Sequence, residues 1–248
     1  MEGRGGACLR ATGSTEGVPI TGASQESCEL IRVEEELKAL GVSVAYRQLR
    51  KVSSVGGDPL KDLLEQQLAS LRSRLTLNSL KDNPVVRAYR SFFWRLKIDP
   101  TKVRPSSEAL ARRALRGEFP RVSPLVDAGN LASVETLVPI GIYDLDLLAP
   151  PLTITLTRGE VRFWPIGGGE QTLPAGTPVM VDTRGFVVHF YAHRDSSLTS
   201  VRETTRRALV VAVGVKEVPL ELVRSAAELT TTYASLVGWA PEGPLCQA

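Results

Sequence analysis

Residues 104–146, RPSSEALARRALRGEFPRVSPLVDAGNLASVETLVPIGIYDLD, decide the fold of this chain, because they contain the pattern of helix, turn, helix and strand. Pro105 disfavours a helical conformation in the residue before it, and Ser106 is a good N-cap. Glu108 places a negative charge in the first turn, where the helix dipole favours it. Gly117 is a typical helix end. The first helix is therefore predicted to begin at about Ser106.

A second helix follows the turn and carries two polar residues inside an apolar pattern. Asp127 and Asn130 lie three residues apart, so they occupy neighbouring positions on one helix face. Pro139 ends this helix, and residues 140–147 are typical of a strand. The apolar positions of the helix are Leu125, Val126, Leu131, Val134 and Leu137.

The rest of the chain predicts a mixed α/β (α+β) fold, with a largely antiparallel sheet system packed by amphipathic helices. Helices are expected at residues 34–40, 60–75, 85–96 and 217–236, where apolar residues recur at helical spacing. Strands are expected at residues 42–49, 152–156, 161–164, 179–181, 186–190 and 208–213. Gly167-Gly168-Gly169 is predicted to be a turn, because no Gly-Lys-Ser/Thr ending of a phosphate loop follows it.

Composition indicates a globular chain of 248 residues with a mean hydropathy near zero. No run approaches the ~18 apolar residues that a membrane helix needs, and the N-terminus has no apolar signal core. A cytoplasmic location without membrane contact is therefore expected. Cys8, Cys28 and Cys246 show no C-x-x-C spacing, so they are predicted to be reduced, incidental thiols.

The domain organisation is predicted from where large apolar residues are dense. Residues 1–26 are rich in Gly, Ser and Thr and are expected to be a disordered tail. One domain is expected over residues 27–238, followed by a C-terminal tail at residues 239–248.

Basic residues gather in the middle of the chain. Residues 84–121 contain ten Arg and Lys against three Asp and Glu, a local charge of +7 in a chain whose total is +3. Such an asymmetry is typical of a polyanion partner such as RNA, although solvated arginines also produce it.

The two histidines, His189 and His193, are predicted on one face of a strand. Four residues of strand separate them by roughly 13 Å, too far to share one metal ion. An exposed position is expected for them, with a place beside a pocket as the alternative. The sequence predicts no metal site and no cofactor.

Three ordered motifs of the central stretch resemble a known family. They are R-P-S-S-E-A-L-x-R-R from Arg104, V-D-x-x-N from Val126 and P-I-G-x-Y-D-L-D from Pro139. Together they resemble the B3/B4 domain, the aminoacyl-tRNA editing domain of the bacterial phenylalanyl-tRNA synthetase β subunit, which also occurs as free-standing proteins. The resemblance extends from about Ser27 to about Leu236.

The resemblance implies roles for particular residues. Asn130 and Thr205 would orient the ester or the attacking water. The substrate pocket would comprise Asp127, Pro139, Gly141, Tyr143, Asp144, Thr199 and Glu203. The acceptor stem of a tRNA would contact Arg104, Arg112, Arg113 and Arg116. Gly129 and Gly141 stand where the family usually has Thr and His, which implies a wider pocket with fewer polar groups.

The function expected from this resemblance is a free-standing editing-like module. It would bind tRNA and hydrolyse the ester of a mischarged aminoacyl-tRNA, without a cofactor. Complete aminoacylation by this chain alone is not expected. The alternatives are a non-catalytic module that binds a free amino acid or related small molecule, and a structural role for Asp127, Asn130 and Asp144 near the helix-to-strand turn.

Overall fold

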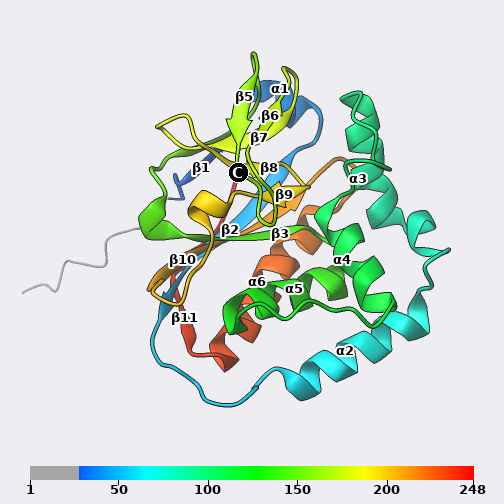
Figure 1. Cartoon of the computed structure of the whole chain (residues 1–248), viewed down its shortest axis with the longest axis vertical. Helices are drawn as coiled ribbons and strands as arrows, with labels where there is room; N and C mark the ends of the chain where they lie inside the picture. The colour runs from blue at the N-terminus through cyan, green and yellow to red at the C-terminus, as the bar shows by residue number, and fades with distance from the viewer. Residues whose placement is uncertain (1–27) are drawn as a thin grey trace, which may run out of the picture.

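The computed structural model describes residues 28–248, so the tail expected at residues 1–26 and Cys8 lie outside the described part. The elements form a mixed α/β fold of three sheets and surrounding helices (Figure 1). This confirms the predicted fold class. The helices are α1 (Glu35–Ala39), α2 (Lys61–Arg74), α3 (Pro84–Arg95), α4 (Ser106–Leu115), α5 (Pro124–Thr136) and α6 (Leu220–Leu236). Short 3₁₀ helices are η1 (Leu80–Asp82), η2 (Leu145–Leu147) and η3 (Ser197–Thr199).

The central sheet has four strands in the order β11-β2-β10-β3, and all of its pairs are antiparallel. Its long strand β10 lies between β2 and β3, which both precede it in the sequence, so distant segments are brought together. The bounds are β2 (Ser43–Lys51), β3 (Ile140–Asp144), β10 (Arg207–Gly214) and β11 (Trp239–Gln247).

A second sheet has five strands in the order β1-β4-β7-β8-β9, and only β1 and β4 pair in parallel. A separate antiparallel pair, β5 and β6, extends from it. The bounds are β1 (Ile31–Val33), β4 (Leu152–Leu156), β5 (Val161–Phe163), β6 (Gln171–Leu173), β7 (Pro178–Val181), β8 (Val187–Phe190) and β9 (Arg194–Asp195).

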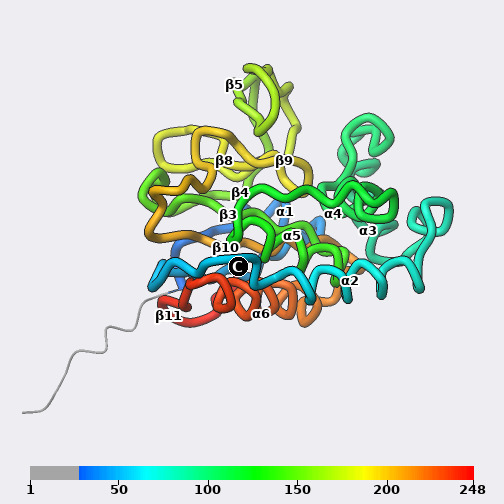
Figure 2. Tube along the Cα trace, turned by 60° about the horizontal axis from the view of Figure 1, so that its bottom comes forward, coloured from blue at the N-terminus to red at the C-terminus, as the bar shows by residue number. Residues whose placement is uncertain are grey.

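Strand β10 contributes to two cores because successive side chains of a strand point to opposite faces. Leu209 and Val211 belong to the main core, with Ile154 and Val188 of the second sheet. Ala208 and Val210 pack with residues of α5 and α6 such as Leu131 and Tyr233. Figure 2 shows α2 lying along the outer side of α5 as a further layer.

Three of the four aromatic residues of α3, Tyr89, Phe92 and Phe93, are part of the main core. Asn83 caps this helix by accepting a hydrogen bond from the Val85 N–H at 2.9 Å, and Pro84 occupies the first turn. Phe92 and Phe93 are fully buried, whereas Trp94 points outward and is 56% exposed.

The C-terminal tail predicted at residues 239–248 is instead part of the fold. Residues Trp239–Gln247 form β11, which pairs with β2 along the edge of the central sheet. The prediction failed because this segment contains two prolines and one glycine near its centre, which are rare in strands. A register shift between Glu242 and Cys246 accommodates them.

The prediction of reduced thiols is also corrected for two of the three cysteines. Cys28 and Cys246 form a disulfide between residues 218 apart in the sequence, joining the segment before β1 to β11. Disulfides are rare in cytosolic proteins, so this bond counts against the compartment expected from the sequence. Across residues 28–248, no helix is both long enough and apolar enough to span a membrane.

Candidate functional site

A cavity lies where α5 and β3 meet the turn between β8 and β9. Asn130 of α5 lines it, together with Ile140 of β3 and the Ile166-Gly167 turn. The cavity has two adjoining compartments of about 340 and 280 Å³, and we call the whole the Asn130 cavity. The polar compartment is lined in part by Ser106, Ser133, His189, His193, Arg194 and Asp195. The apolar compartment includes Val122, Val126, Ile140, Ile142, Ile166 and Val201.

Asp195 contributes to both compartments and is held by two hydrogen bonds to one of its oxygens. Its Oδ1 accepts from the Tyr143 hydroxyl at 2.6 Å and from His189 Nδ1 at 2.7 Å. Its Oδ2 has no hydrogen-bond partner among residues 28–248, and the side chain is 23% exposed. The carboxylate is thus fixed in orientation while one oxygen remains available to a ligand.

His189 is buried, and both of its ring nitrogens have neighbours within hydrogen-bond distance. Its Nε2 accepts a hydrogen bond from the Ala192 N–H at 3.0 Å, so the ring proton must reside on Nδ1, which donates to Asp195. Both nitrogens are therefore used within the protein. The sequence-based expectation of an exposed histidine is wrong at this position, since His189 is 3% exposed.

His193 has one ring nitrogen in use and one free. Its Nδ1 lies 2.7 Å from the carbonyl oxygen of Arg104, which can only accept, so Nδ1 carries the proton. Nε2 then has no partner within the described part of the chain, and the residue lines the polar compartment. Burial lowers the pKa of His193 below its usual 6.5, so the ring is neutral at pH 7.

The Tyr143 hydroxyl explains why residue 141 is a glycine. A β-carbon at Gly141 would overlap that hydroxyl and would lie 2.9 Å from Asp195 Oδ1. At Gly129, a β-carbon would lie 2.6 Å from Cδ1 of Ile142. Side chains of Ile142 and Tyr143 therefore occupy the space beside the two glycines, and Gly129 also lines the apolar compartment.

Other predicted site residues are used in bonds within the fold. Asp127 accepts hydrogen bonds from Arg121 Nε at 2.7 Å and from the Val122 N–H at 2.8 Å. Asp144 accepts from the Thr205 hydroxyl at 2.6 Å and from the Asp146 N–H at 3.1 Å.

Asp127, Pro139, Asp144 and Thr205 do not line the cavity. Thr205 is 2% exposed and also accepts from the Arg202 N–H at 2.9 Å, so it caps a turn. Pro139 is buried ahead of β3, and its carbonyl accepts from the Val213 N–H. Neither residue is among those that line the Asn130 cavity, and Asp144 is not either.

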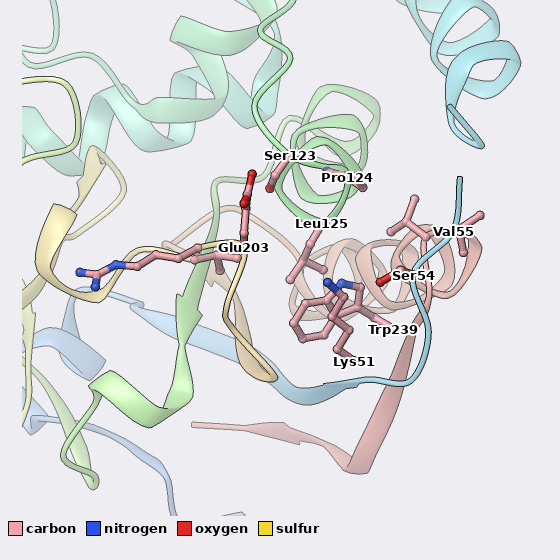
Figure 3. Close-up of a pocket in the computed structure, with 11 residues that line it drawn as sticks. Lys51, Ser54, Val55, Ser123, Pro124, Leu125, Glu203 and Trp239 are labelled. Carbon is pink, nitrogen blue, oxygen red and sulfur yellow. The ribbon is translucent and has the colours of Figure 1, made fainter. Parts of the chain in front are cut away.

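Thr199 and Glu203 do not line the Asn130 cavity either. Thr199 is buried in η3, and its Oγ1 has no hydrogen-bond partner within residues 28–248. Glu203 is exposed and lines a separate cavity of about 340 Å³. Figure 3 shows Glu203 on one side of this second cavity and Lys51 and Trp239 on the other.

The predicted RNA-contacting arginines divide into two kinds. Glu108 is completely buried, and three arginine side chains converge on its carboxylate: Arg90 at 3.0 Å, Arg112 at 3.1 Å and Arg104 at 3.6 Å. We call this group the Glu108 cluster; it carries a surplus of two positive charges. Arg113 and Arg116 are exposed and form no ion pair within the described residues.

Comparison with known proteins identifies the family. The model of the B3/4 domain matches residues 88–235, which is more than half of the chain, and the chain therefore belongs to the B3/4 domain family. This confirms the resemblance seen in the motifs. None of the curated proteins compared with the chain matches it.

A solved structure is similar over most of this chain. It is an N-terminal fragment of the phenylalanyl-tRNA synthetase β subunit from Pyrococcus horikoshii, 17% identical, with a TM-score of 0.47. The match covers 85% of this chain and 49% of the fragment, so the chain spans about half of the fragment's length.

Proposed function

We propose that this chain removes an amino acid from the 3′ end of a tRNA by hydrolysing the ester that joins the two. The observation that carries the proposal is the unpartnered Nε2 of His193 in the same cavity as Asn130. A neutral imidazole can act as a general base at pH 7, and an amide N–H can stabilise an oxyanion. Membership of the B3/4 family supports an RNA-linked substrate.

The chemistry requires no group beyond the chain and a water molecule. His193 Nε2 takes a proton from water as the water oxygen bonds to the ester carbonyl carbon. The Asn130 side-chain N–H donates to the oxyanion that forms. The bond to the ribose oxygen then breaks, and that oxygen takes the proton back from His193. In this scheme His193 replaces Thr205, whose hydroxyl is used by Asp144.

The RNA would extend from the cavity along α4. This helix contributes Ser106 and Leu110 to the cavity and carries Arg113 and Arg116 toward its other end. At about 1.5 Å per residue, ten residues of helix separate Ser106 and Arg116 by about 15 Å. The exposed arginines are therefore within reach of phosphates close to a bound 3′ end.

The test is release of labelled amino acid from a panel of cognate and mischarged tRNAs. The Asn130→Ala and His193→Gln variants should lose about 10²- to 10⁴-fold in rate while retaining RNA affinity. Asn78→Ala, at an exposed position, is the matched control and should behave as wild type. Folded wild-type protein that releases no amino acid from any tRNA contradicts the proposal.

A non-catalytic module for a free amino acid is the second candidate, and the free Oδ2 of Asp195 favours it. That carboxylate oxygen could hold an ammonium group without any RNA. Tight binding of free amino acids, together with an RNA affinity that does not depend on salt, would support this candidate against the first.

The proposed substrate, an aminoacylated tRNA, implies a cytoplasmic location. Disulfides such as the one between Cys28 and Cys246 are rare there. The assays should therefore compare oxidised and reduced protein. Equal rates in both forms are expected, because neither cysteine lines the Asn130 cavity.

A further inference from the structure

We infer that the Asn130 cavity selects esters of α-amino acids that have a free ammonium group and an aliphatic side chain. The ammonium group would bind Asp195 Oδ2, and the side chain would occupy the apolar compartment. This inference rests on the proposed function for the ester itself, and it adds the class of aminoacyl group.

The ammonium assignment follows from how Asp195 is held. Two donors, Tyr143 and His189, bind the same oxygen and leave Oδ2 without a partner among residues 28–248. No Lys or Arg of the described chain forms an ion pair with this carboxylate. A partly buried carboxylate gains most from a ligand that brings a positive charge and N–H donors, as an ammonium group does.

The neighbouring charges also suit an aminoacyl ester of RNA. Arg194 lines the polar compartment, is exposed and forms no ion pair within the described residues. Its guanidinium suits a phosphate of the terminal nucleotide, while Asp195 takes the ammonium group at the other end of the ligand. His193 is neutral at pH 7 and does not compete for Asp195.

The side-chain assignment follows from the apolar compartment. Six aliphatic side chains and no aromatic one line it: Val122, Val126, Ile140, Ile142, Ile166 and Val201. The hydroxyls of Ser197 and Ser200 also line it, but they donate to the carbonyl oxygens of Trp164 and Ser197. Each buried CH₂ contributes about 0.8 kcal/mol, whereas an incoming hydroxyl has only Asn130 as a dedicated polar partner there once the ammonium group occupies Asp195 Oδ2.

The experiment uses short RNA hairpins whose 3′ end carries an amide-linked amino acid, because an amide resists hydrolysis. Leucyl, isoleucyl, tyrosyl and N-acetyl-leucyl forms are compared by calorimetry with the full chain. Leucyl and isoleucyl RNA should bind at least tenfold more tightly than N-acetyl-leucyl RNA and several-fold more tightly than tyrosyl RNA. Equal affinity for the acetylated form, which has no positive charge, would overturn the ammonium assignment.

Variants test the same contacts independently. Asp195→Asn should lose about tenfold in affinity for leucyl RNA and nothing for N-acetyl-leucyl RNA. Asp146→Asn removes an exposed carboxylate and is the matched control. Ile166→Ser, at a position 47% exposed, should weaken leucyl RNA selectively without affecting folding. Unchanged affinity for leucyl RNA in this variant, or tighter binding of tyrosyl than of leucyl RNA by the wild type, would overturn the side-chain assignment.

Binding to a ligand that cannot be hydrolysed separates this inference from the proposed function. Selective binding without release of amino acid from tRNA would leave the inference standing and contradict the hydrolysis. Release of amino acid from tRNA that does not depend on the ammonium group would support the hydrolysis and contradict this inference.

Discussion

The polar residues of the central stretch, 104–146, and those of the turn at residues 189–195 have different hydrogen-bonding states. In the first region the carboxylates of Glu108, Asp127 and Asp144 are saturated by arginines, hydroxyls and backbone N–H groups. In the second region His193 and Asp195 each retain one side-chain atom without a partner in the described chain, and both residues line a cavity. A polar side chain whose hydrogen-bonding atoms all have partners within the protein is a structural residue, whereas one with a free atom is a candidate for ligand binding. This criterion distinguishes the two kinds of residue better than their position within a motif does.

The largest effect is expected where the two regions touch. Gly141→Ala should cost about 3 kcal/mol of unfolding free energy, because the new β-carbon overlaps the Tyr143 hydroxyl and forces it away from Asp195. Urea unfolding measures the loss, and the Asn130 cavity should lose its ligand affinity as well. Gly159→Ala, where a β-carbon meets nothing within 4 Å, is the control. Equal stability of the two variants would refute the packing argument.

A saturated carboxylate should matter for stability rather than for ligand binding. Asp144→Ala leaves the buried Thr205 hydroxyl and the Asp146 N–H without their acceptor, at an expected cost of about 2 kcal/mol. Asp146→Ala, which is exposed, should stay within about 0.5 kcal/mol of wild type. Thermal unfolding checks both values. Equal stability of the Asp144→Ala and Asp146→Ala variants would contradict this expectation.

The partly buried His193 of the turn should make stability depend on pH. Since burial lowers the pKa of His193 in the folded chain, the unfolded chain binds a proton more readily between the two pKa values. Stability contributed by the neutral ring is complete above about pH 6.5 and decreases as pH falls toward the folded pKa, by at most about 1.4 kcal/mol per pH unit. His193→Gln should remove this part of the slope between pH 7.5 and 5.5. An identical slope in the variant would exclude His193 as its source.

The smallest effect on stability is expected from the exposed arginines of α4. Replacing Arg113 and Arg116 together with Gln should leave unfolding within about 0.5 kcal/mol of wild type. The same change should reduce the steepness of the plot of log RNA affinity against log salt concentration by about 1 to 2. Arg158 and Arg162, which are exposed near β5, serve as the control pair. Salt slopes that are equal in both double variants would remove α4 from the RNA surface.

Much of the fold was predictable because it follows from local patterns. The expected start of a helix at Ser106 is confirmed by α4, and the expected strands at residues 152–156 and 208–213 are confirmed by β4 and β10. Apolar periodicity and proline or glycine ends determine these elements without knowledge of the rest of the chain. The bond between Cys28 and Cys246 was not predictable, because no local pattern indicates which distant residues a sheet brings together.

The candidate site was only partly predictable. Asn130 lines the cavity as the motif implies, but Asp195 was missed because nothing in its neighbourhood distinguishes it from a surface carboxylate. The placement of His193 depends on Ala192, which adopts a positive φ of 61°, and β8 ends at Phe190, three residues before this histidine. Alanine gives no signal of such a turn, so the sequence was interpreted as a continuous strand. The one available signal was the presence of both histidines and Asp195 within seven residues.

The link between Cys28 and Cys246 makes nearly all of the described chain a closed covalent loop. A single proteolytic cut in the exposed segment at residues 53–59 would open this loop without separating the two pieces. The nicked protein would migrate as one species in a denaturing gel until a reductant is added, and then as two. A fragment that separates without reductant would show that the two ends of the chain were never joined.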